Sequence, residues 1–121
     1  MVLSGINRGG NLGEDITYSG TVAAAIEGTL LGLPSVALSQ HYKDRQKVSW
    51  KTAEIWVARV LKSLLKEEWP AGVFMNVNFP DVPPGAVTGI EFSRQGRRKI
   101  GGALIEGRDP RGDKYFWIGP Q

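Results

Sequence analysis

The sequence contains no cysteine, a single histidine (His41) and no long apolar run. Without cysteine there is no disulfide framework, thiolate chemistry or cysteine-built zinc site, and one histidine cannot form a multi-histidine metal site. The apolar stretches are far shorter than the roughly 20 residues of a membrane span, and no secretory leader follows Met1. These features predict a soluble protein of the reducing cytoplasm with no membrane partner.

A strong excess of one charge is also missing, because 15 Lys and Arg stand against 12 Asp and Glu, a net charge of +3. The one dense basic cluster, Arg94, Arg97, Arg98 and Lys99, contains no aromatic residue on which a base would stack. We therefore expect no binding to a nucleic-acid polymer, and we expect the cluster to face solvent or another subunit. The 121 residues, 41% of them hydrophobic, match one modest globular domain.

Apolar runs alternate with segments of helical period along residues 1–80. The apolar runs predict buried strands at 2–6, 35–39 and 72–79. The periodic segments predict helices from 19 to about 31 and from about 51 to 68. This order of strand, helix, strand, helix and strand is typical of parallel α/β units.

The composition changes after Pro80. A proline-rich turn at 81–85 precedes a predicted short strand at 90–92. Residues 104–119 are expected to form a hairpin around a turn at 109–113. We therefore divide the chain into a central α/β part, residues 1–80, and a second part, residues 81–121, with the turn, the short strand and the hairpin.

The candidate site lies where the first predicted strand ends at Asn7 and a glycine-rich loop follows. Ligands bind at the carboxyl ends of strands in open α/β sheets. Ser19-Gly20-Thr21 opens the next helix, and the unpaired N–H groups of a helix N-terminus can hold a phosphate. Asn7 can offer a neutral oxygen to Mg²⁺ or Mn²⁺, although one asparagine is not a metal site. The residues alone slightly favour an alternative, in which Asn7 hydrogen-bonds to the loop and Ser19 only caps the helix.

Other chemical motifs are weaker. The region around residues 4–21 matches neither the Walker A pattern nor the GxGxxG fingerprint. His41 lacks a serine–histidine–carboxylate arrangement, so we expect it to pack in a loop or on the surface. The adjacent carboxylates of Glu14 and Asp15 are expected to be solvated, and residues 111–113 (Arg-Gly-Asp) to form part of the hairpin turn.

A series of short motifs runs in order along nearly the whole chain. They are Ser-Gly-Ile-Asn at 4–7, Gly-Asn-Leu-Gly at 10–13, Tyr-Ser-Gly-Thr-Val-Ala-Ala-Ala at 18–25, Glu-Gly at 27–28, Gly-Leu-Pro-Ser-Val-Ala-Leu-Ser at 32–39, Asn-Val-Asn-Phe-Pro at 76–80, Asp-Pro-Arg-Gly at 109–112 and Tyr-Phe-Trp-Ile-Gly at 115–119. This ordered string closely resembles the SurE family of metal-dependent 5′/3′-nucleotidases.

The resemblance implies a three-layer α/β/α, Rossmann-like core with a protruding β-hairpin that makes contacts in a homo-oligomer, a dimer or a tetramer. It also implies phosphomonoester hydrolysis of nucleoside monophosphates with a divalent metal, Mg²⁺ or Mn²⁺. By the same likeness, Asn7 is a metal ligand, Ser19, Gly20 and Thr21 lie beside the phosphate, and Asn11 contacts the substrate or supports a ligand.

The family's other metal ligands, an aspartate pair and a serine, precede the Ser-Gly-Ile-Asn motif, whereas only residues 1–3 precede it here. The family also continues beyond residues 118–120. We therefore expect the middle portion of a SurE chain, without a catalytic residue of its own, inactive or nearly so alone and prone to associate. The alternative is a non-catalytic remnant or oligomerisation module that keeps the hairpin of residues 96–119.

Overall fold

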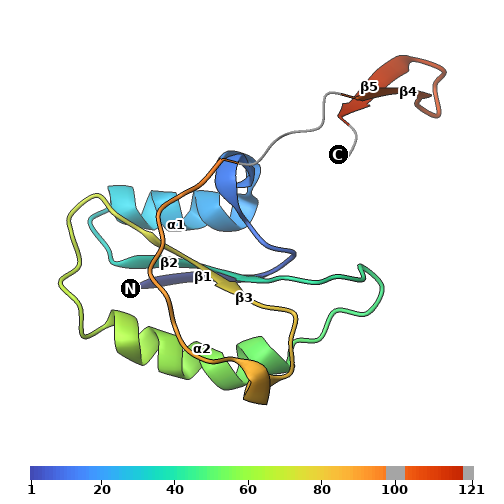
Figure 1. Cartoon of the computed structure of the whole chain (residues 1–121). Helices are drawn as coiled ribbons and strands as arrows, with labels where there is room; N and C mark the ends of the chain where they lie inside the picture. Colours follow the sequence, from blue (N-terminus) through green and yellow to red (C-terminus); the bar gives the residue numbers. More distant parts are fainter. Residues whose placement is uncertain (98–102, 119–121) are drawn as a thin grey trace.

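The structure is a computed structural model that describes residues 1–97 and 103–118. Its centre is a three-stranded parallel sheet, and a two-stranded antiparallel hairpin lies apart from it (Figure 1). The sheet consists, in spatial order, of β1 (Val2–Arg8), β2 (Ser35–Gln40) and β3 (Met75–Phe79). The hairpin consists of β4 (Leu104–Arg108) and β5 (Lys114–Ile118).

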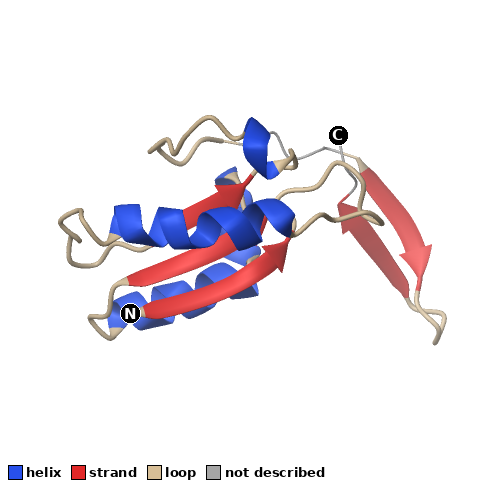
Figure 2. Ribbon diagram, turned by 90° about the horizontal axis from the view of Figure 1, so that it is seen from below, coloured by secondary structure: helices blue, strands red, loops and turns tan. Residues whose placement is uncertain are grey.

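Two helices cover opposite faces of the sheet, α1 (Gly20–Leu30) and α2 (Lys51–Leu64), as Figures 1 and 2 show. Both crossovers advance in the same direction, from β1 to β2 to β3. Two crossovers of the same hand would put both helices on one face, so one of these crossovers is left-handed. Right-handed crossovers make up about 98% of cases, and no feature of the sequence marked the exception. The exception creates the expected three-layer α/β/α arrangement.

The core lies on both faces of β2, which is buried at all six positions. Because side chains alternate along a strand, Ala37 faces α1, whereas Val36 and Leu38 face α2. The buried residues of the layer under α1 are valine and alanine, while larger buried side chains such as Leu64 and Phe79 fill the layer under α2. The interpretation of 35–39 as a strand covered on both sides is confirmed.

The predicted elements differ from the structure in a few places. A 3₁₀ helix, η1 (Gly13–Tyr18), occupies much of the predicted loop. Helix α2 ends at Leu64 and β3 begins only at Met75, because residues 70–73 form a turn closed by the bond from Val73 N to Pro70 O (3.3 Å). The strand predicted at 90–92 is wrong: beyond the 3₁₀ turn η2 (Pro84–Ala86), residues 87–97 form neither helix nor strand.

The hairpin turn is confirmed at 109–113. Asp109 Oδ1 accepts the N–H groups of Arg111 and Asp113, both at 2.9 Å, and Gly112 takes a positive φ of 92°. The Arg-Gly-Asp tripeptide therefore forms part of a β-turn held by an aspartate. Of the basic cluster, Arg98 and Lys99 lie outside the described residues.

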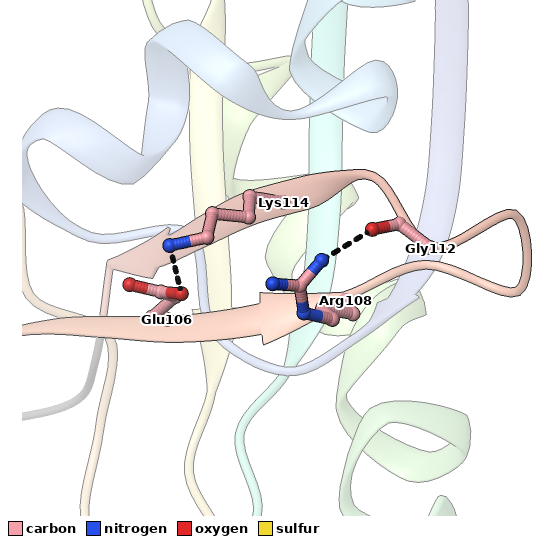
Figure 3. Close-up of polar contacts among 4 residues, drawn as sticks. All are labelled: Glu106, Arg108, Gly112 and Lys114. Atoms are coloured by element: carbon pink, nitrogen blue, oxygen red, sulfur yellow. Dashed lines mark hydrogen bonds and ion pairs between the residues drawn. The ribbon is translucent and has the colours of Figure 1, made fainter.

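Two further side-chain contacts brace the hairpin (Figure 3). Lys114 Nζ lies 2.8 Å from Glu106 Oε1, and Arg108 Nη1 donates to Gly112 O at 2.7 Å. Within the described residues, no helix is long and apolar enough to cross a membrane.

Candidate functional site

The end of β1 is shaped by Gly5. Its φ is +134°, and a Cβ there would lie 2.4 Å from Leu38 O on the neighbouring strand. Only glycine allows this approach, because any side chain would collide with the backbone of β2. The pairing register of β1 and β2 shifts between Ser4 and Asn7, after which Asn7 lies opposite Ser39. The glycine of the Ser-Gly-Ile-Asn motif thus fits the irregular strand that carries Asn7.

Asn7 joins the carboxyl end of β1 to the start of α1. Its Nδ2 donates to Gly9 O at 2.9 Å, which holds the glycine-rich loop, and its Oδ1 accepts a long hydrogen bond from Thr21 Oγ1 at 3.4 Å. In O–H···O hydrogen bonds of ordinary strength, the two oxygen atoms are about 2.5–3.0 Å apart. The weak contact leaves the Asn7 oxygen available to a better partner.

The N-terminus of α1 is capped by Ser19, whose Oγ accepts the N–H of Val22 at 3.3 Å. Apart from its chain neighbours and the backbone of α1, no heavy atom of the described residues lies within 4 Å of the place where a Cβ on Gly20 would be. The first turn is therefore open to an approaching ligand. The end of β1 and the first turn of α1 therefore come together, with Asn7 beside Thr21. The alternative considered from the sequence also holds, since Asn7 bonds to the loop and Ser19 caps the helix.

Asn11 is buried, with 5% of its surface exposed, and its polar groups point inward. Its N–H donates to Asn78 Oδ1 at 2.8 Å, and its carbonyl accepts from Asn76 Nδ2 at 2.8 Å and Asn78 Nδ2 at 3.2 Å. Its own Nδ2 donates to Ser39 Oγ at 2.8 Å. These bonds fasten the loop to β2 and β3, while contact of Asn11 with a substrate stays a prediction. Sequence reasoning missed the two β3 asparagines, although their i, i+2 spacing places them on one face of a strand.

Gln40 is a third residue that sequence reasoning missed. It is fully buried, and its Nε2 donates to the carbonyls of His41 and Pro80, both at 3.0 Å. Its Oε1 accepts the N–H of Ala53 in the first turn of α2 at 3.2 Å. One amide thus ties the end of β2 to the end of β3 and to α2. No signal in the sequence separated Gln40 from the polar loop that follows it.

The residues at this site do not make a metal centre on their own. Asn7 Oδ1 and Thr21 Oγ1 are two neutral oxygens, and the described part of the chain contains no group of three His, Cys, Asp or Glu placed to hold an ion. Mg²⁺ is bound in near-octahedral geometry, through one or two carboxylates together with waters and substrate phosphates. The described residues therefore offer neutral oxygens to such a site but not a complete set of ligands.

The sequence is similar to those of known proteins. A sequence model of the family described as Survival protein SurE matches residues 1–102. The protein named 5′-nucleotidase SurE from Paramagnetospirillum magneticum is 59% identical over 121 residues, which are 100% of this chain and 46% of that protein. The protein of the same name from Parvibaculum lavamentivorans is 52% identical, over 98% of this chain and 44% of its own length.

The fold has a similar counterpart among solved structures. The crystal structure of SurE protein from Aquifex aeolicus superposes with a TM-score of 0.79 and 41% identity, covering 98% of this chain and 47% of that one. The chain therefore spans about half the length of the relatives that it matches.

Proposed function

The chain belongs to the SurE family, and from that premise we propose that it supplies the phosphate-holding middle part of an enzyme that hydrolyses nucleoside monophosphates. Two of the relatives above bear the name 5′-nucleotidase SurE. The observation that carries the proposal is the meeting of Asn7 Oδ1 and Thr21 Oγ1, 3.4 Å apart, at the open first turn of α1. This arrangement offers a phosphate hydrogen-bond donors and places an amide oxygen beside them.

The phosphate would bind at the N-terminus of α1. The first N–H groups of a helix lack partners within the helix, and the helix dipole adds about half a positive charge there. Gly20 has no side chain to keep an anion away from the backbone, and the hydroxyls of Ser19 and Thr21 flank it. Asn11 would act indirectly, by fastening the loop between Asn7 and Ser19 to the sheet.

Asn7 would supply one neutral ligand to a divalent cation, Mg²⁺ or Mn²⁺. Since the described residues contain no group of three His, Cys, Asp or Glu placed to hold an ion, we expect further ligands to come from a longer protein. We therefore expect the 121-residue chain alone to hydrolyse a nucleoside monophosphate with Mn²⁺ very slowly or not at all.

A chimera tests the proposal. These 121 residues would replace the matching segment of the Paramagnetospirillum magneticum relative, and nucleotide hydrolysis would be measured with Mn²⁺. Thr21→Val should lower kcat/KM by about 10- to 100-fold, the effect of losing a hydrogen bond to a charged group. Thr29→Val is the matched control, because Thr29 lies at the other end of α1 and donates to Ala25 O.

Two results would contradict this function. One is a folded chimera that does not hydrolyse nucleotides, which would favour the non-catalytic module. The other is an equal loss of activity in the Thr21→Val and Thr29→Val chimeras, which would remove the threonine of the first turn from the phosphate site.

We also propose that residues 81–121 serve assembly, with the hairpin contacting a second copy of the chain. Four large apolar side chains of the hairpin are each more than half exposed: Leu104 (66%), Ile105 (55%), Phe116 (61%) and Trp117 (63%). An isolated two-stranded hairpin is marginally stable in water, and exposed apolar patches mark interaction surfaces. Trp117→Ser should shift the chain toward monomer in sedimentation velocity; an unchanged distribution would exclude the hairpin from the contact.

A further inference from the structure

A cavity of about 440 Å³ opens beyond the end of β2, on the same edge of the sheet as Asn7. It is lined by Gly9, Gly10, Leu12, Asp15, His41 and Tyr42. Sites for small molecules typically measure about 300–1,000 Å³. The cavity is therefore large enough for part of a nucleotide, and two of its six lining residues carry aromatic rings.

The rings of His41 and Tyr42 are nearly parallel, with centroids 6.5 Å apart and an angle of 14° between their planes. A planar molecule stacked on one ring is therefore nearly parallel to the other. Nucleobases stack on tyrosine and histidine rings with little dependence on base identity, because every base has a π-face. The pair thus has the geometry of a stacking platform.

The glycine-rich loop is fitted to these rings. A Cβ on Gly9, where φ is +109°, would lie 3.3 Å from Tyr42 Cε1, and a Cβ on Gly10 would lie 3.3 Å from His41 Nδ1. Side chains at either position would press against the rings. The two glycines therefore keep both rings close to the loop backbone.

The backbone beneath the platform is held on several sides. His41 N–H donates to Phe79 O at 2.8 Å, and its carbonyl accepts from the buried Gln40 Nε2 at 3.0 Å. Gly9 N–H donates to Gln40 O at 2.9 Å, which joins the loop to the end of β2. His41 itself is exposed, and neither ring belongs to the hydrophobic clusters of the described residues. The side chains are thus presented to a ligand by a fixed main chain.

The platform lies at the same end of the parallel sheet as Asn7. Asn7 pairs with Ser39 in β2, and His41 follows Gln40, the last residue of that strand. In a nucleotide the ribose separates the phosphate from the base, so the two groups need neighbouring subsites of this kind. Resting on the proposed function, we propose that His41 and Tyr42 form the stacking platform for the base of the nucleotide, purine or pyrimidine.

The experiment uses NMR on the 121-residue chain, where the single histidine gives one set of imidazole signals. Adenosine, which lacks the phosphate, and inorganic phosphate are titrated separately. Adenosine should shift the ring protons of His41 and Tyr42 upfield in a saturable manner. Phosphate should move the amide signals of Gly20 and Thr21 and leave the two rings unchanged.

Variants sharpen the adenosine titration. Tyr42→Ala and His41→Ala should each weaken adenosine binding at least about fivefold, whereas Tyr42→Phe keeps the ring and should bind as the wild type does. Tyr115→Ala is the control, because Tyr115 is an aromatic residue of the hairpin, away from the cavity. The amide spectrum of each variant reports whether it is folded.

The outcomes separate the platform from the proposed function. Adenosine that shifts neither ring, or that binds Tyr42→Ala and His41→Ala as tightly as the wild type, overturns the platform even when phosphate binds at Gly20. Adenosine that binds the rings supports the platform even when phosphate leaves the α1 amides unmoved, a result that would count against the phosphate site. If an alanine variant unfolds, the Tyr42→Phe titration and the wild-type ring shifts decide.

Discussion

Replacing Gly28 with alanine adds one methyl group where α1 meets the sheet. The new Cβ would lie 2.5 Å from Ser35 Oγ, 2.7 Å from Val2 Cγ2 and 2.9 Å from Val2 Cβ. Ser35 is fully buried, and its hydroxyl donates to Leu33 O at 2.9 Å, so it cannot swing aside without losing that bond. Val2 Cβ is fixed to the backbone of β1. The helix must therefore move away from the sheet.

Two opposing free energies decide the result. Alanine is favoured over glycine inside a helix by about 1 kcal/mol. Overpacking a close-fitting contact costs about 1–3 kcal/mol, and contacts with two neighbours at once place Gly28→Ala near the upper value. The free energy of unfolding should therefore fall by about 2 kcal/mol. At a urea m-value of about 2 kcal/mol/M, the unfolding midpoint drops by about 1 M.

Urea unfolding followed by tryptophan fluorescence measures this change. Gly20→Ala is the matched control, because the same substitution in the same helix meets open space and should change stability by less than about 1 kcal/mol. In the double variant Gly28→Ala with Val2→Ala, the contact with Val2 Cγ2 disappears while those with Val2 Cβ and Ser35 Oγ remain, so the two losses should be less than additive. A Gly28→Ala chain as stable as the wild type would refute the reasoning.

Three further predictions concern other contacts of the structure. Asn11→Ala removes the donor that bonds to the fully buried Ser39 hydroxyl, and the free energy of unfolding in urea should fall by about 1–3 kcal/mol. A fall below about 0.5 kcal/mol would contradict the role of Asn11 in fastening the loop to the sheet. Trp56→Phe keeps an aromatic ring in α2 but removes the bond from its Nε1 to Pro84 O (3.0 Å), so stability should fall by about 1 kcal/mol by thermal melting, with Trp117→Phe as the control. Lys114→Ala breaks the exposed ion pair of the hairpin. Exposed ion pairs contribute little, so the free energy of unfolding in urea should fall by less than about 0.5 kcal/mol. A larger fall would mean that the pair stabilises the chain more than an exposed ion pair does.

Features that depend on near neighbours could be predicted from the sequence alone. Ser19 caps α1 because its hydroxyl reaches an N–H three residues away, and Asp109 closes the hairpin turn within four residues. Membership of the SurE family, read from the ordered motifs, is confirmed by the match over residues 1–102. The meeting of Asn7 with Thr21 also followed, since a parallel unit brings the end of one strand to the start of the next helix.

The tertiary structure alone decided which residues support that site. Asn11 and Asn78 are 67 positions apart, and their hydrogen bonds exist only because β3 returns parallel to β1 with β2 between them. Tyr42 meets Gly9 for a similar reason, and the unusual hand of one crossover gave each helix its own face of the sheet. Local propensities act over a few residues, whereas these contacts arise when distant segments bury apolar surface together, and the sequence records no partner for them.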